Sequence, residues 1–235
     1  MTTAPSGLRE GAPSDSARQA EFGRGGAQPY DLALRSGGGH LAVVRAATAG
    51  DAVPTVLDVS AYLQPATADE RHVLALTSGP VLDVGCGPAR MVRAAIEAGR
   101  LALGIDISYA AVQHARALGL PVLHRSVFDP VPAEGTWGTV ALFDGNIGIG
   151  GDPVALLARA SALLRAGGRL IVEAHPEPSR EHRFTAQLAH PVGGRSDWFP
   201  WAEFGEHAVR RVLGESGMDH STVTAGGRTF VLARR

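Results

Sequence analysis

Two glycines and two aspartates between residues 81 and 106 have the types and spacing of a nucleotide-binding turn. Gly85 and Gly87 follow a short apolar run and precede a helical segment that begins at Arg90. Glycine adopts positive φ freely and lets the backbone approach a ligand that a side chain would block. Free N–H groups at the start of the following helix add donors. We therefore expect ligand binding here, the simpler alternative being a tight strand-to-helix connection.

The aspartates narrow the choice of ligand. Asp83 lies two residues before Gly85, where its charge would attract the ammonium and sulfonium groups of S-adenosylmethionine. Asp106 lies 19 residues after Gly87, which is the distance at which an acidic residue reaches ribose hydroxyls. Because Ser108 can cap the next helix by itself, we expect Asp106→Ala to leave the ligand-free fold nearly unchanged.

Further polar side chains are expected at the same edge of the sheet. Ser126, Val127 and Phe128 end the third strand, where an adenine ring would lie. Asp144 and Asn146 follow the fourth strand and either face cofactor or substrate or bond only to local backbone.

His175 follows the fifth strand, and as a catalytic candidate it could remove a proton from a substrate. A solvated loop histidine is the simpler interpretation. Cys86 is expected to be a small residue in a crowded turn rather than a reactive thiol. His190, Arg195 and the aromatic cluster at residues 198–201 precede the last helix. The aromatic rings either line a substrate pocket or pack that helix onto the sheet.

Apolar runs that alternate with helical segments predict an α/β fold with a mostly parallel sheet. Helices are expected from a Thr67–Glu70 capping box and at residues 90–98, 108–118, 152–164 and 205–216. Seven strands are expected at residues 80–84, 101–106, 122–125, 139–143, 169–174, 221–224 and 228–233. Gly226 and Gly227 predict a tight antiparallel hairpin between the last two strands.

Three segments are expected along the chain. Residues 1–28 have few large apolar side chains and are predicted to be a disordered tail. Residues 29–66 are predicted to be a cap with short helical pieces at 30–34 and 41–44. Residues 67–235 are predicted to form the Rossmann-like domain.

Composition excludes several classes of protein. The 235 residues carry a formal net charge of −1, so no nucleic-acid partner is expected. No apolar run is long enough to span a bilayer, and no secretory signal is evident, so a cytoplasmic protein is expected. Cys86 is the only cysteine, which excludes an intrachain disulfide and a multi-cysteine zinc site; no metal is expected. All 22 basic residues are arginines, which excludes lysine-dependent chemistry.

Four motifs in order, at residues 83–89, 104–108, 143–145 and 163–170, resemble those of class I S-adenosylmethionine-dependent methyltransferases. The resemblance covers residues 67–235 and implies a Rossmann-like fold of seven strands and S-adenosylmethionine as cofactor. It places methionine at the glycine turn, ribose at Asp106 and adenine between Ile107 and Phe128. Ala89 replaces the third glycine, and Ser126 replaces a frequent aspartate. The cofactor residues implied are Asp83, Gly85, Cys86, Gly87, Asp106, Ile107, Ser126, Val127, Phe128 and Asp144.

Three functions remain open from the sequence. The first is methyl transfer to a small-molecule acceptor, with His175 or Asn146 as catalytic candidates. The second is a nicotinamide-dependent oxidoreductase, which Asp83, the absent lysine and the terminal hairpin disfavour. The third is a catalytically silent S-adenosylmethionine-binding subunit that supports a partner. The acceptor and the oligomeric state are not determined by the sequence.

Overall fold

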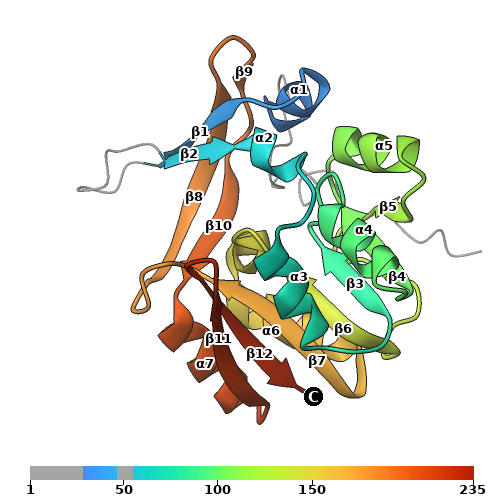
Figure 1. Cartoon of the computed structure of the whole chain (residues 1–235). Helices are drawn as coiled ribbons and strands as arrows, with labels where there is room; N and C mark the ends of the chain where they lie inside the picture. Colours follow the sequence, from blue (N-terminus) through green and yellow to red (C-terminus); the bar gives the residue numbers. More distant parts are fainter. Residues whose placement is uncertain (1–28, 47–54) are drawn as a thin grey trace, which may run out of the picture.

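A computed structural model describes residues 29–46 and 55–235 of the chain, and its main feature is a seven-stranded sheet (Figure 1). The strand order is β11-β12-β7-β6-β3-β4-β5. Neighbours from β7 to β5 are parallel, whereas β12 pairs antiparallel with β7 and β11 antiparallel with β12. The strands are β3 (Val81–Val84), β4 (Ala102–Asp106), β5 (Val122–His124), β6 (Trp137–Leu142), β7 (Leu164–Ala174), β11 (Asp219–Ala225) and β12 (Arg228–Arg234). The predicted fold class is confirmed, including the C-terminal hairpin.

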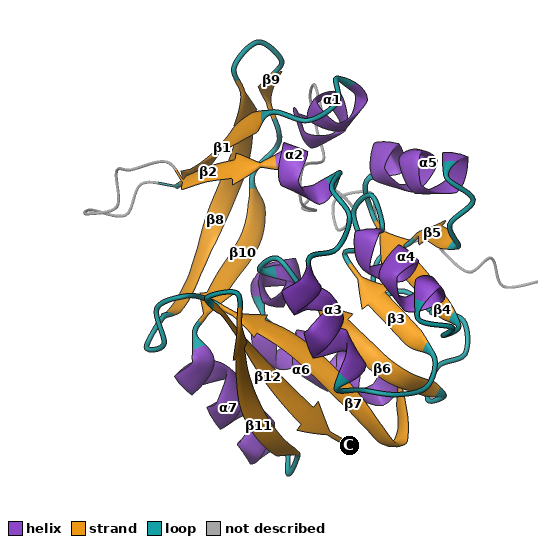
Figure 2. Ribbon diagram, in the orientation of Figure 1, coloured by secondary structure: helices purple, strands orange, loops and turns teal. Residues whose placement is uncertain are grey.

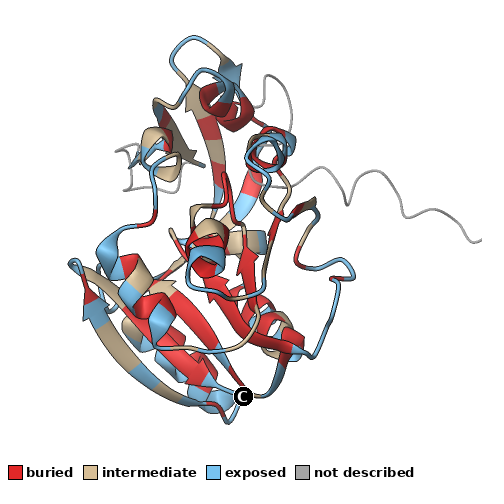
Figure 3. Ribbon diagram, turned by 45° about the vertical axis from the view of Figure 1, so that its right-hand side comes forward, coloured by how far each residue is buried: buried red, intermediate tan, exposed pale blue. Residues whose placement is uncertain are grey.

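Helices cover both faces of this sheet (Figure 2). Those on the first face are α3 (Ala68–Ala75), α4 (Arg90–Glu97) and α5 (Tyr109–Ala117), and those on the second are α6 (Pro153–Leu163) and α7 (Glu206–Glu215). Alternate residues of one strand enter opposite cores: Val81 packs with α3 and α4, and Leu82 packs with α6 and α7. The strands at the centre of the sheet are consequently buried on both sides (Figure 3).

The helix starts follow the capping residues read from the sequence. The Thr67 side chain accepts from Glu70 N, and Glu70 Oε2 accepts from Thr67 N, which completes the capping box. Ser108 caps α5 by accepting from Ala111 N at 3.1 Å. Asp152 caps α6 by accepting from two backbone N–H groups, with Pro153 in its first turn. These caps satisfy donors that each helix start would otherwise leave without a partner.

A second, antiparallel sheet stands over the carboxyl edge of the first (Figure 1). Its order is β10-β8-β1-β2, with β9 on β8. Its strands are β1 (His40–Arg45), β2 (Thr55–Asp58), β8 (Glu181–His190), β9 (Gly194–Arg195) and β10 (Phe199–Phe204). With α1 (Pro29–Arg35) and α2 (Val59–Tyr62) it forms what we call the cap.

The cap corrects one sequence-based prediction and adds strands that were not predicted. The predicted helical piece at 30–34 lies within α1, but the piece at 41–44 is wrong because those residues form β1. Val43 pairs with Leu188 of β8, so a partner far along the chain determines its conformation. Strands before and after residue 66 pair in one sheet, and the division of the chain there stays a prediction. The predicted disordered tail, 1–28, lies outside the described residues.

A buried hydrogen bond fastens the cap to the main sheet. Ser108 Oγ donates to Asp31 Oδ1 at 2.5 Å, and both residues are buried. This hydrogen bond joins α1 of the cap to the start of α5, two residues after Asp106. In the part of the chain that the structure describes, no helix has the length and apolarity needed to cross a membrane.

Candidate active site

The glycine turn adopts the backbone predicted for it. Gly85 and Gly87 have φ of +69° and +52°, values at which a side chain is strained. Gly85 N and Cys86 N both donate to Ile105 O, at 2.9 and 3.1 Å, which holds the turn against the end of β4. A Cβ on Gly85 would lie 2.7 Å from Asn146 Nδ2. Only glycine therefore fits between β3 and the loop that follows β6.

Asp106 links this turn to the start of α5. Its Oδ2 accepts from Gly87 N at 2.8 Å, and its Oδ1 accepts from Ser108 N at 2.7 Å. Desolvation raises the pKa of the carboxyl group, against the effect of these two hydrogen bonds. The expectation that the ligand-free fold is indifferent to Asp106 needs correction, because its removal leaves two backbone donors without their acceptor.

One cavity of about 500 Å³ lies between the glycine turn and the cap. The predicted cofactor residues that line it are Gly85, Cys86, Gly87, Asp106, Ile107, Ser126, Val127, Phe128 and Asp144. The structure thus brings together residues from four strand ends. Phe128 is 46% exposed and presents a ring at the rim. Cys86 is buried, and burial raises the pKa of its thiol, as expected of a packing residue.

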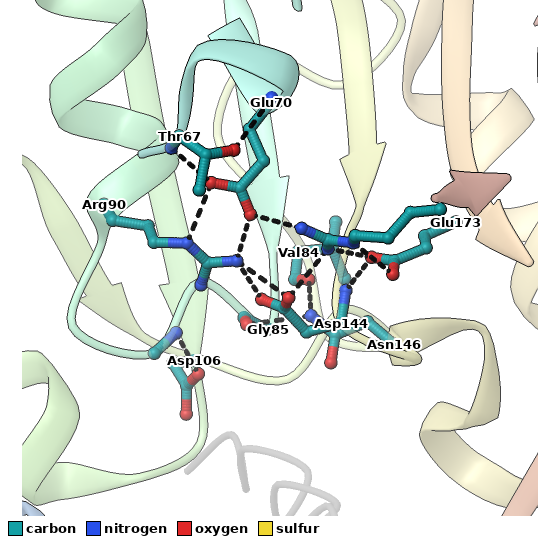
Figure 4. Close-up of polar contacts among 11 residues, drawn as sticks. Thr67, Glu70, Val84, Gly85, Arg90, Asp106, Asp144, Asn146 and Glu173 are labelled. Atoms are coloured by element: carbon teal, nitrogen blue, oxygen red, sulfur yellow. Dashed lines mark hydrogen bonds and ion pairs between the residues drawn. The ribbon is translucent and has the colours of Figure 1, made fainter. Parts of the chain in front are cut away.

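A network of ion pairs built around the buried carboxylate of Glu70, with its other four members partly buried, lies beside the turn (Figure 4). Arg90 Nη2 donates to Glu70 Oε1 at 2.6 Å and to Asp144 Oδ1 at 2.7 Å. Arg228 donates to the same two carboxylates, at 2.6 and 3.0 Å, and to Glu173 Oε1 at 2.7 Å. Burial alone would raise the pKa of Glu70, but hydrogen bonds from Arg90 and Arg228 hold it at about 2. Three carboxylates against two guanidinium groups leave a net negative charge.

The network orients the loop that follows β6. Asp144 has φ of +56°, and its N donates to Glu173 Oε2 at 2.6 Å. Two residues on, Asn146 Nδ2 donates to Val84 O and Gly85 O, both at 2.9 Å (Figure 4). Asp144 and Asn146 both line the cavity, and Asn146 also bonds directly to the glycine turn.

Asp83 and His175 do not line the cavity. Asp83 is 2% exposed, and burial raises the pKa of its carboxyl group to about 7 although Arg90 opposes the shift. The side chain therefore lies outside the cavity, and burial favours the neutral form of its carboxyl group. His175 directly follows the end of β7, and its Nδ1 accepts from Glu177 N at 3.1 Å. This contact matches the simpler interpretation of a loop histidine.

Sequence reasoning missed the cap residues that line the cavity. Tyr30 of α1, Val43 of β1, Leu57 of β2, Tyr62 of α2 and Ala186 of β8 all reach it. These residues lie before or after the recognisable motifs, so no motif marks them. Only the pairing of β1 with β8 could show that they reach the cavity. Of the aromatic cluster, Phe199, Pro200 and Trp201 line the cavity, whereas Trp198 does not.

Comparisons with known proteins agree with this geometry. Residues 82–172 match a family model described as a methyltransferase domain. No curated protein sequence matches the chain. Among solved structures, a SAM-dependent methyltransferase from Bacteroides fragilis, crystallised with S-adenosyl-L-homocysteine, has a TM-score of 0.72 at 19% identity. That alignment covers 87% of this chain and 93% of the other.

Two further structures share the fold. The glycopeptide N-methyltransferase MtfA, complexed with S-adenosyl-L-homocysteine, has a TM-score of 0.55 at 17% identity, covering 73% of this chain and 90% of that one. The CcbJ methyltransferase from Streptomyces caelestis has a TM-score of 0.54 at 15% identity, covering 74% and 91%. The chain has the class I Rossmann-like methyltransferase fold. It contains a methyltransferase domain, and the predicted enzyme class is confirmed.

The buried network predicts a large effect of Arg228→Ala. The variant leaves Glu70, which is 2% exposed, with one guanidinium partner, and Glu173 loses its ion pair. Breaking a buried pair is costly, and because Arg228 is itself partly exposed we expect a loss of about 2–4 kcal/mol in the free energy of unfolding. Arg211→Ala is the control, because Arg211 pairs with Glu181 and Glu215 at the surface and its loss is expected to cost under about 1 kcal/mol. Urea unfolding measures both, and equal losses would contradict the structural importance of the network.

The raised pKa of Asp83 predicts that the free energy of unfolding depends on pH. Between about pH 4 and pH 7 the unfolded carboxyl group is ionised while the native one, with a pKa of about 7, still holds its proton. Raising the pH therefore favours the unfolded chain, with a full effect of roughly 4 kcal/mol. Asp83→Asn removes this contribution, so its melting temperature, measured from pH 4.5 to pH 8, is expected to fall less than that of the parent. Glu70, with a pKa of about 2, titrates below this window. Parallel curves for the two proteins would refute a raised pKa.

Proposed function

We propose that this protein transfers the methyl group of S-adenosylmethionine to a small-molecule acceptor bound between the Rossmann-like sheet and the cap. The observation that carries the proposal is a cavity lined on one side by the glycine turn and Asp106 and on the other by cap side chains. A pocket closed by two parts of one chain favours a small acceptor over a macromolecule.

The residues present fit S-adenosylmethionine by their chemistry. The glycine turn offers close backbone approach, and the Asp106 carboxylate retains acceptor capacity for hydroxyl groups beyond its two backbone bonds. Ile107 and the partly exposed ring of Phe128 line the same cavity and offer apolar surfaces to the adenine ring of the cofactor. The solved neighbours crystallised with S-adenosylmethionine or its product support the same cofactor.

When bound, S-adenosylmethionine supplies a methyl group whose bond to sulfur breaks as an acceptor heteroatom bonds to the carbon, the released electron pair staying on sulfur. The chain contributes orientation and exclusion of water. Cap residues such as Tyr62 and Trp201 line the same cavity as the turn, and the ion-pair network orients the loop that follows β6.

The cavity offers no histidine for proton removal among the described residues that line it. Asp106 and Asp144 both line it, but their carboxylates already accept hydrogen bonds from backbone or arginine donors. We infer that an acceptor proton leaves to water past the exposed rim at Phe128 and Pro200, and that neither His175 nor Asn146 is needed as a base.

The proposal is tested with methyl-labelled S-adenosylmethionine and a cell extract divided into a low-mass filtrate and a macromolecular fraction. Label is expected to enter compounds of the filtrate. Label confined to protein or nucleic acid would refute a small acceptor. Binding of S-adenosylhomocysteine without transfer to either fraction, restored only by an added partner protein, would instead favour a silent subunit.

The affinity for the cofactor is expected to depend on the Asp106 carboxylate. In Asp106→Ala we expect binding of S-adenosylhomocysteine to weaken by about 2–4 kcal/mol, because bonds to a charged acceptor are lost. Asp152→Ala is a matched control, because Asp152 also accepts from two backbone N–H groups but lies outside the residues that line the cavity.

Calorimetry on the parent and both variants, with NADH as a control ligand, decides the prediction. Asp152→Ala is expected to lower the melting temperature and leave affinity unchanged. Affinity of Asp106→Ala within threefold of the parent would exclude Asp106 as a ligand. NADH binding tighter than S-adenosylhomocysteine would overturn the cofactor.

A further inference from the structure

We propose that the aromatic wall of the cap is the acceptor subsite and that it selects a flat, uncharged ring compound over a charged one. This inference rests on the proposed function, because it assumes that the opposite wall holds the cofactor. It goes beyond that function in naming the chemical class of the acceptor and the residues that select it.

Among the described residues, the charged side chains that line the cavity all lie outside the cap. Arg125 and Asp129 are exposed at the rim, and Asp106 belongs to the glycine turn. Arg90 and Asp144 are paired within the buried network. The cap, in the part of it that the structure describes, lines the cavity with apolar and aromatic side chains and two phenols.

Two rings form the centre of this wall. Phe199 and Trp201 are two residues apart on β10, so both point to one face of the strand. Their ring centroids lie 6.0 Å apart in an edge-to-face arrangement. Opposite Phe199 in the register, β8 carries Ala186, whose side chain is small and also lines the cavity. Phe199 and Ala186 are buried behind the wall, so the partly exposed ring of Trp201 is the aromatic surface against which a flat molecule can lie.

The glycines after β6 hold this wall in place. A Cβ on Gly148 would lie 2.5 Å from Trp201 Cε2, and one on Gly151 would lie 2.7 Å from Pro200 Cβ. A Cβ on Gly150 would likewise meet Phe128 Cε2 at 2.9 Å. The segment Asn146–Gly151, which forms the 3₁₀ helix η2, thus packs its backbone directly on these side chains, which accounts for its glycine-rich sequence.

Tyr62 supplies a polar group to the subsite, whereas the Tyr30 hydroxyl lies near the glycine turn, 3.1 Å from the position of a Cβ on Gly87. Both line the cavity, and burial raises the pKa of each phenol above its ordinary value, so both stay neutral. A neutral hydroxyl can exchange a hydrogen bond with an acceptor hydroxyl or amine but cannot balance a full charge. A charged acceptor would lose its hydration against this wall and gain no counter-ion from the cap.

The first test compares two probes that share one ring system and differ in charge. The protein is saturated with S-adenosylhomocysteine so that the cofactor region is filled, and calorimetry then measures binding of 2-naphthol and of naphthalene-2-carboxylate. We expect 2-naphthol to bind at least tenfold more tightly. Equal affinities, tighter binding of the carboxylate, or no binding of 2-naphthol to the loaded protein would overturn the subsite.

The second test uses three variants of β10 and its approach. Trp201→Ala is expected to weaken 2-naphthol binding at least tenfold, and Trp201→Phe, which keeps a ring, to stay within threefold. Trp198→Ala is the matched control, because Trp198 is 44% exposed and does not line the cavity. Affinity for S-adenosylhomocysteine is expected to change less than threefold in all of them. Equal losses in Trp198→Ala and Trp201→Ala would overturn the assignment.

The order of measurement separates the two proposals. Binding of S-adenosylhomocysteine is measured first, and its absence would overturn the proposed function together with the subsite that rests on it. Binding of S-adenosylhomocysteine with failure of the probe comparison overturns the subsite alone. If Trp201→Ala does not fold, the comparison of the two probes on the parent protein still decides.

Discussion

The contact between Arg228 and the carboxylates of Glu70, Asp144 and Glu173 ties helix α3 and the loop after β6 to the paired strands β7 and β12. Arg228 begins β12, and Glu70 lies in the first turn of α3, 158 residues earlier. Arg90 closes the network at the start of α4. Since no member is fully exposed, each charge depends on the others for compensation. The loop after β6, and through Asn146 the glycine turn, takes its position from this network.

The cap depends on the same edge of the sheet in a different way. Its strands β1 and β8 are distant in sequence, and pairing between them places apolar side chains over the glycine turn. The Asp31–Ser108 hydrogen bond fastens α1 to the residue that caps α5. One end of the cavity is therefore polar and built by strand ends, while the other is aromatic and built by the cap, an arrangement that suits a polar cofactor beside an apolar acceptor.

Local sequence signals were sufficient to predict most helices and strands of the Rossmann-like sheet. The capping residues Thr67, Ser108 and Asp152 act within four residues of their partners, so their effect can be read without a fold. Asp83 shows the limit of such reading. Its position beside the glycine turn was predicted from spacing, but its burial, and hence its raised pKa, depends on the helices that cover β3.

The sequence by itself determined the strands of the main sheet with their terminal hairpin, the glycine turn, the cofactor edge and the enzyme class, because these rest on short motifs and on periodicity. Tertiary structure alone decided that residues 41–44 form a strand, that His175 lies away from the cavity, and that Trp201 rather than Trp198 lines it. The strand at residues 41–44 depends on pairing with β8, more than a hundred residues distant, and the other two depend on which way a side chain points in the assembled fold. Local propensity contains no information about either, because strand pairing and burial are properties of the assembled sheet.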